Sequence, residues 1–568
     1  MTSHPLKVLI LGGYGTFGGR LAQLLADESR LTLIIAGRSR AKAQAFCAQL
    51  PSAATLVPTA FDRDGDVERQ LREIAPDIVV DATGPFQFYG DDPYRVVEAA
   101  LASGVDYLDL ADGSDFVRGI SRFDAKARAR KIFILAGVSS FPVLTAAVVR
   151  TLARGMVRVD RVTGGIAPSP FANVGINVIR AIASYAGKPV AVIADGHEAV
   201  RFALIDDRPF TIAPPGRLPL HRTRFSLVDV PDLTVLPQLW PSLREVWMGA
   251  GPVPAVWHRV LNGCAWLVRL KLLPSLSFLA PMMHRAINLL SFGEHRGGMF
   301  VAAQGAGPGG EALARSWHLT AEGDDGPLIP SMAAAAVIRN CLADRRPASG
   351  ARPAVSDLEL SDYEPLFARR MIHTGFRQDS PVDACAPLYR RLLGDAWNAL
   401  PQPLRAMHDL TGALNAAGLA EVERGTSWLA RLIARVIGFP QPGRDIPLTV
   451  SFHVLAQADG HEREHWKRAF AGQAFASTQE EGRGRFERLL CERFGPCNFA
   501  MALVCEDDRM RLVLRHWTLL GVPMPLALAP LIDAYESAEG GCFHFHVAIA
   551  HPLSGLIVRY RGWLVPQR

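Results

Sequence analysis

The fold of this chain is decided by the stretch Lys7-Val-Leu-Ile-Leu-Gly-Gly-Tyr-Gly-Thr-Phe-Gly18. Its apolar residues run directly into a glycine-rich turn, and Gly19–Leu25 then carries leucines at helical spacing. Gly13, Gly15 and Gly18 fit the G-x-G-x-x-G spacing of dinucleotide sites, where glycine permits a tight turn, the approach of a pyrophosphate and close helix–strand packing. The stretch predicts a phosphate-binding strand, turn and helix. The alternative is a glycine-rich loop without a ligand.

The loop after the second predicted strand indicates which dinucleotide is bound. Leu31–Ala36 is a compact apolar run, and Arg38 follows it at about 20 residues beyond Gly18. NAD sites carry an acidic residue at this distance for the ribose 2′-hydroxyl, whereas a guanidinium binds a 2′-phosphate through charge-assisted hydrogen bonds. Ser39 and Arg40 extend the polar loop. We therefore expect NADP rather than NAD, and the alternative is a solvated basic loop.

Strand and helix patterns alternate over residues 1–150 and predict a Rossmann-type doubly wound parallel sheet. After the first two strands, a third is expected to end near Phe61, and a fourth lies within Ile78–Phe86, where it runs into a turn. A fifth is expected at Tyr107–Ala111 and a sixth at Lys131–Ala136. The carboxyl ends of such strands face the cofactor, so side chains there are candidates for the site.

Asp62 follows the third strand and is expected at the adenine edge of the cofactor. Together with Asp64 and Asp66 it resembles a metal cluster, but the later glutamate of a calcium loop is missing from the sequence. We expect no metal at this position.

Five motifs follow one another in the first domain. They are Gly12-Gly-Tyr-Gly-Thr-Phe-Gly18, Ala36-Gly-Arg38, Thr83-Gly-Pro-Phe86, Gly104-Val-Asp-Tyr-Leu-Asp109 and Ala136-Gly-Val-Ser-Ser-Phe-Pro142. In this order they resemble the saccharopine dehydrogenase (saccharopine reductase-like) family. The resemblance implies that the glycine loop binds the pyrophosphate, that Arg38 binds the 2′-phosphate, and that the Gly-Pro-Phe turn lies near the nicotinamide. The expected cofactor-binding residues are Gly13, Tyr14, Gly15, Thr16, Phe17, Gly18, Arg38, Ser39, Asp62, Gly84, Pro85 and Phe86.

The chain departs from that family at two places. The family often has Gly-Glu soon after its Tyr-x-Asp strand, where this chain has Ala111-Asp-Gly-Ser-Asp115. An Asp is common after the proline at position 142, where this chain has Val143-Leu144. The resemblance therefore does not extend to the substrate.

Residues 151–345 are expected to form an inserted mixed α/β domain that binds substrate or dimerises. Strands are expected at Arg158–Ile166, Phe202–Ile205, Arg224–Val228, Met299–Ala303 and Trp317–Thr320, and helices at Gly175–Ala186 and Pro330–Leu342. The last helix is expected to return to the Rossmann domain. Two prolines and little apolar content then predict a linker over residues 346–360.

Two apolar stretches within the chain are candidates for contact with a membrane. Val253–Leu290 is rich in Leu, Trp and Met, and is expected to form short packed core helices, because prolines and charged residues interrupt it. The alternative is a lipid-facing or dimerising surface. Trp517–Ile532 also contains prolines, so no transmembrane span is expected, while peripheral membrane contact and a homodimer stay open.

Composition narrows the class of protein. A net charge of +6 over 568 residues comes without a long basic run, which argues against a nucleic-acid partner. The eight cysteines form no C-x-x-C pair, and the N-terminus does not have the pattern of a signal peptide. We expect a cytoplasmic protein.

Residues 361–568 are expected to form a C-terminal α+β domain rich in antiparallel strands. Four motifs resemble an uncharacterised domain that is appended to such reductase domains in some bacterial proteins. They are Trp466-Lys-Arg-Ala-Phe470, Phe494-Gly-Pro496, Gly521-Val-Pro-Met-Pro525 and Tyr560-Arg-Gly-Trp563. This resemblance implies no chemistry.

The same domain contains the literal zinc-protease motif H-E-x-x-H, with His461 and His465. On a helix both histidines would hold one zinc ion. Asp459-Gly460, however, predicts a hairpin turn, and the residues after it alternate as in a strand. Residues four apart on a strand are separated by about 13 Å, too far to share a metal ion. We expect no metal site here.

The leading hypothesis is an NADP-dependent oxidoreductase that transfers hydride to or from a carbon–nitrogen, carbon–oxygen or activated carbon–carbon double bond. Its substrate is expected to be a small molecule, and hydrophobic or lipid-type compounds are favoured. Candidate proton donors are Tyr89, Tyr107 and Asp112. One alternative is a non-catalytic NADP-binding protein with a C-terminal lipid- or partner-binding domain. Another is a zinc hydrolase acting through His461 and His465.

Overall fold

The decisive N-terminal stretch forms β1 (Leu6–Leu11) and α1 (Thr16–Leu25). The fold is that of a computed structural model, which describes residues 4–220, 223–252, 255–289, 291–379, 386–456 and 462–567. Contacts divide the chain into two units, the first with Met1–Phe210 and Thr223–His373, the second with Thr211–Arg222 and Thr374–Arg568.

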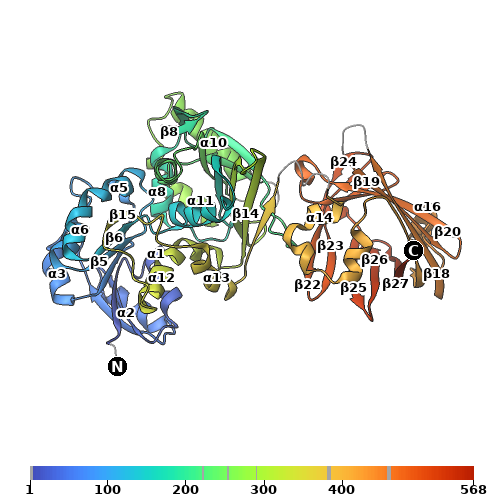
Figure 1. The fold of residues 1–568 in the computed structure, drawn as a ribbon, viewed down its shortest axis with the longest axis horizontal. Coiled ribbons are helices and arrows are strands. Elements are labelled where there is room, and N and C mark those ends of the chain that lie inside the picture. The colour runs from blue at the N-terminus through green and yellow to red at the C-terminus, as the bar shows by residue number, and fades with distance from the viewer. Residues whose placement is uncertain are drawn as a thin grey trace. The chain divides into compact units, whose positions relative to one another are not determined.

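The first sheet has seven strands in the order β15-β6-β5-β4-β1-β2-β3, and all of them pair in parallel (Figure 1). Val8, Leu9 and Ile10 are fully buried, as the continuous apolar runs of a sheet covered on both faces require. The remaining strands are β2 (Leu31–Gly37), β3 (Thr55–Ala60), β4 (Ile78–Asp81), β5 (Asp106–Asp109), β6 (Phe133–Ala136) and β15 (Gly350–Pro353). The predicted doubly wound sheet is confirmed.

Helices cover both faces of this sheet. Leu9 and Leu11 belong to a core shared with α3 (Val67–Ile74), α4 (Arg95–Ser103) and α6 (Asp124–Arg130). On β1 and β2 lies α1, which also packs against α12 (Ile329–Leu342), the helix expected to return to this domain. The Ser331 hydroxyl on α12 donates a 3.0 Å hydrogen bond to the Phe17 carbonyl.

Part of the expected linker over residues 346–360 instead forms β15, at the edge of the first sheet. The guanidinium of Arg346 forms an ion pair with Asp106 at the start of β5, with a shortest distance of 2.5 Å. This contact and the pairing with β6 hold the segment on the sheet. Four residues that include Gly, Arg and Pro carry no apolar pattern, which is why sequence periodicity missed the strand.

The second sheet of the first unit is mixed, in the order β10-β11-β12-β7-β13-β14-β16. Its central strand β7 (Arg158–Ala167) pairs in parallel with β12 (Glu245–Ala250) and antiparallel with β13 (Arg296–Ala306). The other strands are β10 (Asp207–Phe210), β11 (Thr223–Leu227), β14 (Ala312–Glu322) and β16 (Ile372–Gln378), and β8 (Pro189–Ala194) forms a separate hairpin with β9 (His197–Phe202). The inserted α/β fold is confirmed.

Two local predictions in this region are wrong. The strand expected at Phe202–Ile205 ends at Phe202, because Leu204 turns the chain with a φ of 60°. The stretch Val253–Leu290 does contain helices, α10 (Ala255–Arg269) and α11 (Ala280–Leu289), but many of its large apolar side chains are exposed rather than in a core. Its hydrophobic pattern could not show that these side chains stay exposed among the described residues.

The second unit contains an antiparallel sheet of eleven strands, ordered β22-β21-β20-β19-β18-β17-β27-β26-β25-β23-β24. Because β22 also pairs with β23, ten of the strands close into a ring. Trp466, Phe452 and Tyr560 pack in the core of this unit. The strands are β17 (Ala413–Arg424), β18 (Gly443–Ala456), β19 (Glu462–Phe470), β20 (Gln473–Glu481), β21 (Leu490–Phe494), β22 (Cys497–Glu506), β23 (Arg509–Leu519), β24 (Val522–Met524), β25 (Leu531–Glu539), β26 (Cys542–His551) and β27 (Gly555–Gln567).

The predicted α+β character of this unit is confirmed, with α14 (Leu388–Leu393), α15 (Gln402–His408) and α16 (Trp428–Ile437) beside the sheet. The short segment Thr211–Arg222 belongs to it as well. Arg377 donates a 2.6 Å hydrogen bond to the Ala213 carbonyl, and the Cys505 amide donates one of 2.8 Å to the Gly216 carbonyl. The unit is thus built from two segments far apart in the sequence.

The H-E-x-x-H motif lies partly on β19, where His465 pairs with His453 of β18, so the predicted strand is confirmed. His461 lies outside the described residues. Glu464 accepts a hydrogen bond from the Trp466 indole in the interior, and burial raises the pKa of Glu464 to about 7. The helical face that a zinc protease needs is therefore not formed by Glu462–His465.

Candidate functional site

The glycine turn between β1 and α1 leaves no room for side chains. Gly12 has a φ of +70°, and a Cβ there would lie 2.9 Å from the Ala82 carbonyl oxygen. A Cβ on Gly18 would lie 2.3 Å from the Gly12 carbonyl oxygen, and one on Gly13 would lie 2.8 Å from the Ile10 carbonyl oxygen. These positions therefore require glycine for steric reasons alone. Gly12 is the turn residue that the G-x-G-x-x-G spacing did not identify.

The N-terminus of α1 follows the glycine turn directly. Gly15 precedes the helix without a capping side chain, and no acidic residue lies in the first turn. The first amide groups of a helix have no partner within the helix, and together with the helix dipole they favour an anion. Gly15 and Thr16 also line a cavity of about 430 Å³, with Arg20, Phe46, Asn173 and Arg370 farther along its wall.

Tyr14 and Ser39 connect the glycine turn with the loop after β2. The Ser39 amide donates a 3.2 Å hydrogen bond to the Tyr14 hydroxyl, and the Tyr14 ring packs over Gly37, where a Cβ would lie only 2.6 Å from it. The Ser39 hydroxyl accepts from the Lys42 amide and so caps α2 (Arg40–Gln49). Arg38 is exposed, and it forms no ion pair or hydrogen bond with any other described residue. Its guanidinium is available at the end of β2.

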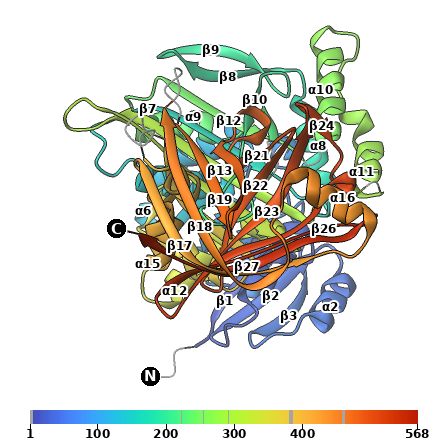
Figure 2. The ribbon, with the colours of Figure 1, turned by 90° about the vertical axis from the view of Figure 1, so that its right-hand side faces the viewer.

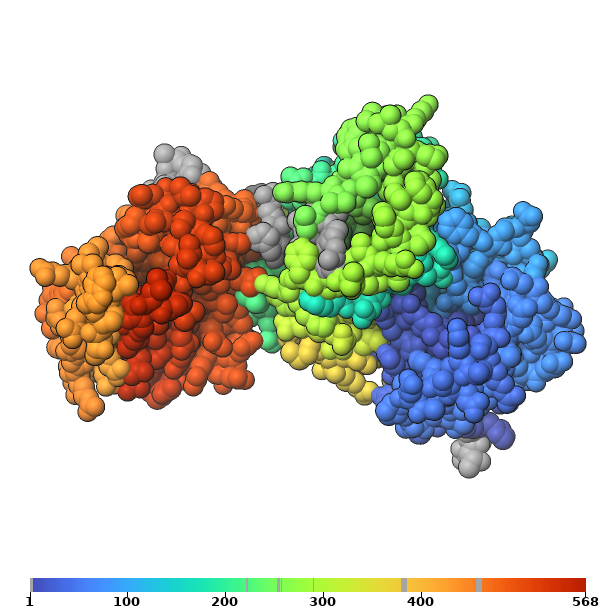
Figure 3. Space-filling view, turned by 180° about the vertical axis from the view of Figure 1, so that it is seen from behind, coloured from blue at the N-terminus to red at the C-terminus, as the bar shows by residue number. Residues whose placement is uncertain are grey.

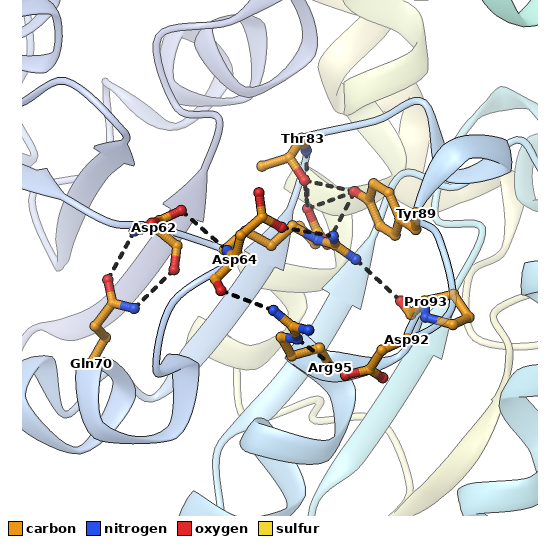
Figure 4. A network of polar contacts seen from close by, with 10 residues as sticks. Asp62, Asp64, Gln70, Thr83, Tyr89, Asp92, Pro93 and Arg95 are labelled. Carbon is orange, nitrogen blue, oxygen red and sulfur yellow. Dashed lines mark hydrogen bonds and ion pairs between the residues drawn. The ribbon is translucent and has the colours of Figure 1, made fainter.

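Asp62 makes local contacts after β3 (Figure 4). Its carboxylate accepts a 3.1 Å hydrogen bond from the Asp64 amide, and its backbone exchanges two hydrogen bonds with the Gln70 side chain. Asp66 caps α3 by accepting from the Arg69 amide. These contacts give Asp62 and Asp66 local structural roles. Asp62 is exposed at the carboxyl end of its strand, as a residue at the adenine edge would be.

The Gly84-Pro85-Phe86 turn follows β4, and its peptide bond between Gly84 and Pro85 is cis. Phe86 is buried against Phe116, with ring centroids 5.0 Å apart. Asn177, in the first turn of α8 (Ile176–Tyr185), donates a 3.0 Å hydrogen bond to the Gly84 carbonyl. The second domain therefore reaches the strand end where a nicotinamide ring is expected, a contact that sequence analysis did not foresee.

Two of the three candidate proton donors are tied into the interior. Tyr89 lies 2.6 Å from the Thr83 hydroxyl and 3.3 Å from the Asp81 carboxylate, and the Arg63 guanidinium stacks 3.4 Å above its ring (Figure 4). Tyr107 is fully buried, and its hydroxyl lies close to the buried Asp109 carboxyl, with which it interacts. Burial raises the pKa of both phenols well above the ordinary value, so neither is suited to give up a proton.

The third candidate, Asp112, lies just after β5; the residue is exposed, while protein atoms surround its carboxyl group. Desolvation by surrounding protein atoms raises the pKa of its carboxyl; the Gln87 amide, which donates a 3.0 Å hydrogen bond, opposes this rise, and the charge of Asp229 adds to it. Asp229 follows β11 and accepts a 2.8 Å hydrogen bond from Ser114. Burial, together with the charges of Asp112 and Asp229, raises the pKa of Tyr185 at the end of α8. Asp112, Asp229 and Tyr185 therefore form one electrostatic cluster, of which sequence analysis found only Asp112.

Two family models match parts of this chain. Residues 8–132 match the family model of the saccharopine dehydrogenase NADP binding domain, and residues 400–564 match that of a domain of unknown function (DUF4166). No curated protein matches the chain. The first domain is therefore similar to the NADP binding domain of saccharopine dehydrogenase, and this similarity supports a nicotinamide cofactor.

The solved structures that match part of this chain include the following three proteins. Saccharopine dehydrogenase (L-Glu forming) from Saccharomyces cerevisiae is 13% identical, with a TM-score of 0.47, covering 66% of this chain and 100% of its own. Biliverdin reductase from Synechocystis is 13% identical, with a TM-score of 0.28 and coverage of 61% and 92%. A variant meso-dapdh from Clostridium tetani is 12% identical, with a TM-score of 0.31 and coverage of 63% and 96%.

Proposed function

We propose that this chain is an NADP-dependent oxidoreductase that acts on a small-molecule substrate at the carboxyl end of its first sheet. The proposal rests on the glycine turn, where no side chain fits at Gly12, Gly13 or Gly18. This turn leads into the N-terminus of α1, and the Arg38 guanidinium is exposed at the end of β2. Such a turn accommodates a pyrophosphate, and such a cation accommodates a 2′-phosphate.

The residues present fit the cofactor at three points. The amides of Thr16 and Phe17 would hold the pyrophosphate, Arg38 and Ser39 would hold the 2′-phosphate, and the backbone at Gly84 would lie beside the nicotinamide. When bound, the nicotinamide supplies hydride-transfer chemistry. The chain must then bind and orient the substrate and supply a proton.

Asp112 is the proposed proton donor. The residue is exposed, and the raised pKa of its carboxyl keeps the proton on the oxygen at a higher pH than in an ordinary aspartate. Gln87 orients the carboxyl through its amide. Asp229 acts as a positioning residue, because its charge contributes to that raised pKa. A carbon–nitrogen, carbon–oxygen or activated carbon–carbon double bond could accept hydride and proton in such a site.

A binding titration followed by a turnover screen tests the proposal. NADPH should saturate one site on the purified protein, and NADPH oxidation should follow addition of a substrate from a panel of imines, ketones and enoyl compounds. Saturable binding without turnover across the panel would instead favour a non-catalytic NADP-binding protein. Absence of NADPH binding would reject both.

Replacing Arg38 with Ala tests the cofactor preference. The affinity for NADPH should fall by roughly thirtyfold to a hundredfold, because a charge-assisted contact to the 2′-phosphate contributes about 2–3 kcal/mol. The affinity for NADH should hardly change. Isothermal titration of both cofactors measures the two effects, with Lys42→Ala on the exposed face of α2 as the matched loss of one cation. Equal losses for NADPH and NADH would show that Arg38 does not contact the 2′-phosphate.

A further inference from the structure

A band of exposed apolar side chains covers α10, α11 and the connection between them. Among the described residues of the first unit, fifteen large apolar side chains are exposed, and ten of these lie between Val256 and Phe292. We call these ten residues the apolar band. Its members are Val256, Val260, Trp266, Leu267, Leu270, Leu272, Phe278, Met282, Leu289 and Phe292.

The helices are apolar on two faces rather than one. The inner face packs against the rest of the unit, where His258, Ala265 and Val268 of α10 and Ala280 of α11 are buried. The outer face repeats the helical spacing at Val256, Val260 and Leu267, whose side chains are between 40% and 54% exposed. Figure 2 shows the two light-green helices following one another along one side, and Figure 3 shows this green segment facing outward. Exposed patches of this extent on a folded protein mark an interaction surface.

The segment that carries the apolar band has charged side chains of one sign. The sequence from Val246 to Gly293 contains no Asp or Glu, whereas Arg259, Arg269, Lys271 and Arg285 all lie within it. The Arg269 guanidinium stacks 3.8 Å from the centroid of the Phe202 ring. The other three cations are exposed and form no ion pair with the described residues. The surface therefore combines large apolar side chains with unpaired positive charge.

This combination of apolar side chains and positive charge favours one binding partner over another. In a twofold dimer the same patch faces itself, so these cations would be brought together without an acidic residue of the band to neutralise them. An anionic bilayer has no such conflict, because its headgroups carry phosphate charges while its acyl region accepts the apolar side chains. Trp266 and Phe278 are suited to the interface between the two.

We propose that the apolar band is a docking surface for an anionic lipid bilayer, with Arg259, Lys271 and Arg285 contacting lipid phosphates. The described helices include none that is both long and apolar enough to cross a membrane. The band lies on α10 and α11 rather than on the glycine turn, so docking does not depend on the function proposed for the cofactor site.

Vesicle co-sedimentation of the full chain without cofactor tests this. The wild-type protein should sediment with vesicles of phosphatidylglycerol and phosphatidylcholine, sediment far less with pure phosphatidylcholine, and be released in part by high salt. The triple variant Arg259→Glu, Lys271→Glu and Arg285→Glu should bind at least about a hundredfold less tightly, given about 1 kcal/mol for each surface cation. The variant Trp266→Ser, Leu270→Ser and Phe278→Ser should lose binding to a similar degree.

Two control variants carry the same kinds of change elsewhere on the first unit. Lys126→Glu, Arg130→Glu and Arg154→Glu match the charge reversal, and Val57→Ser, Val157→Ser and Met371→Ser match the loss of exposed apolar side chains. Both should bind vesicles like the wild type, and thermal melting checks that each variant is folded. The proposal is overturned if the wild type ignores anionic vesicles or if folded band variants still bind them. It is also overturned if light scattering shows a dimer that only the band variants dissociate, with no vesicle binding, since a second copy then covers the band.

Discussion

Replacing Gly18 with Ala is expected to abolish useful binding of NADPH. The new methyl carbon would lie 2.3 Å from the Gly12 carbonyl oxygen and 2.9 Å from the Gly13 Cα, and all of these are backbone atoms that cannot rotate away. The turn must therefore open, and it loses the shape that brings amides to the pyrophosphate. Overpacking of this kind costs roughly 3 kcal/mol, which corresponds to a loss of about a hundredfold or more in affinity. Fluorescence titration with NADPH measures it.

The neighbouring glycine provides the control for this substitution. A Cβ on Gly19 would meet the edge of the Phe46 ring at 3.2 Å, a side chain that can shift, and would lie 3.7 Å from the Gly13 carbonyl oxygen. Gly19→Ala should therefore bind NADPH within a few-fold of the wild type. A melting temperature for each variant separates loss of the site from loss of the fold. If folded Gly18→Ala bound NADPH as tightly as Gly19→Ala does, the glycine turn would not be the phosphate site.

Replacing Asp112 with Asn is expected to lower kcat by about 100- to 10,000-fold, the usual contribution of a positioned general acid. An amide keeps the hydrogen bond to Gln87 but cannot deliver an acidic proton. NADPH affinity should stay within a few-fold, because Asp112 follows β5 and not the glycine turn. The measurement is steady-state NADPH oxidation with whichever substrate the turnover screen identifies.

Asp115 gives the matched control for Asp112. It lies three residues later with a side chain that is 91% exposed and paired with Arg118, so Asp115→Asn should leave kcat unchanged. An equal kcat for Asp112→Asn and the wild type would remove Asp112 from the mechanism.

The pH profile tests the role of Asp229 separately. A carboxylic acid donor works while protonated, so the rate should fall as the pH rises through the pKa of Asp112. In Asp229→Asn a negative charge that raises this pKa is gone, and the alkaline limb should move to lower pH. Profiles of kcat for wild type and Asp229→Asn measure the shift. An unmoved limb, or a shift to higher pH, would mean that Asp229 does not position the donor electrostatically.

Local sterics made the glycine turn predictable from the sequence. The spacing of Gly13, Gly15 and Gly18 predicts the backbone conformation of the turn. Arg38 follows the turn at a sequence separation set by one helix and one strand. Asp112 was a candidate because an acid after a parallel strand falls at the ligand-binding edge. None of these inferences requires knowledge of how distant segments pack.

Asn177, Tyr185 and Asp229 could not be found in this way. They reach the site only because the second domain packs α8 and the end of β11 toward the first sheet, and their own sequence neighbourhoods carry no motif. The misjudged apolar face of α10 and α11 has a related cause. Periodicity shows that a helix has an apolar face, but whether a neighbour covers that face depends on the tertiary fold.

The most direct test of the central claim is equilibrium titration of the wild-type protein with NADPH and, separately, with NADH. We expect one saturable site for NADPH per chain, with an affinity at least about tenfold above that for NADH because Arg38 contributes only to the former. Failure of NADPH to bind at concentrations up to about 1 mM, the upper end of the usual range of KM values, would contradict the account.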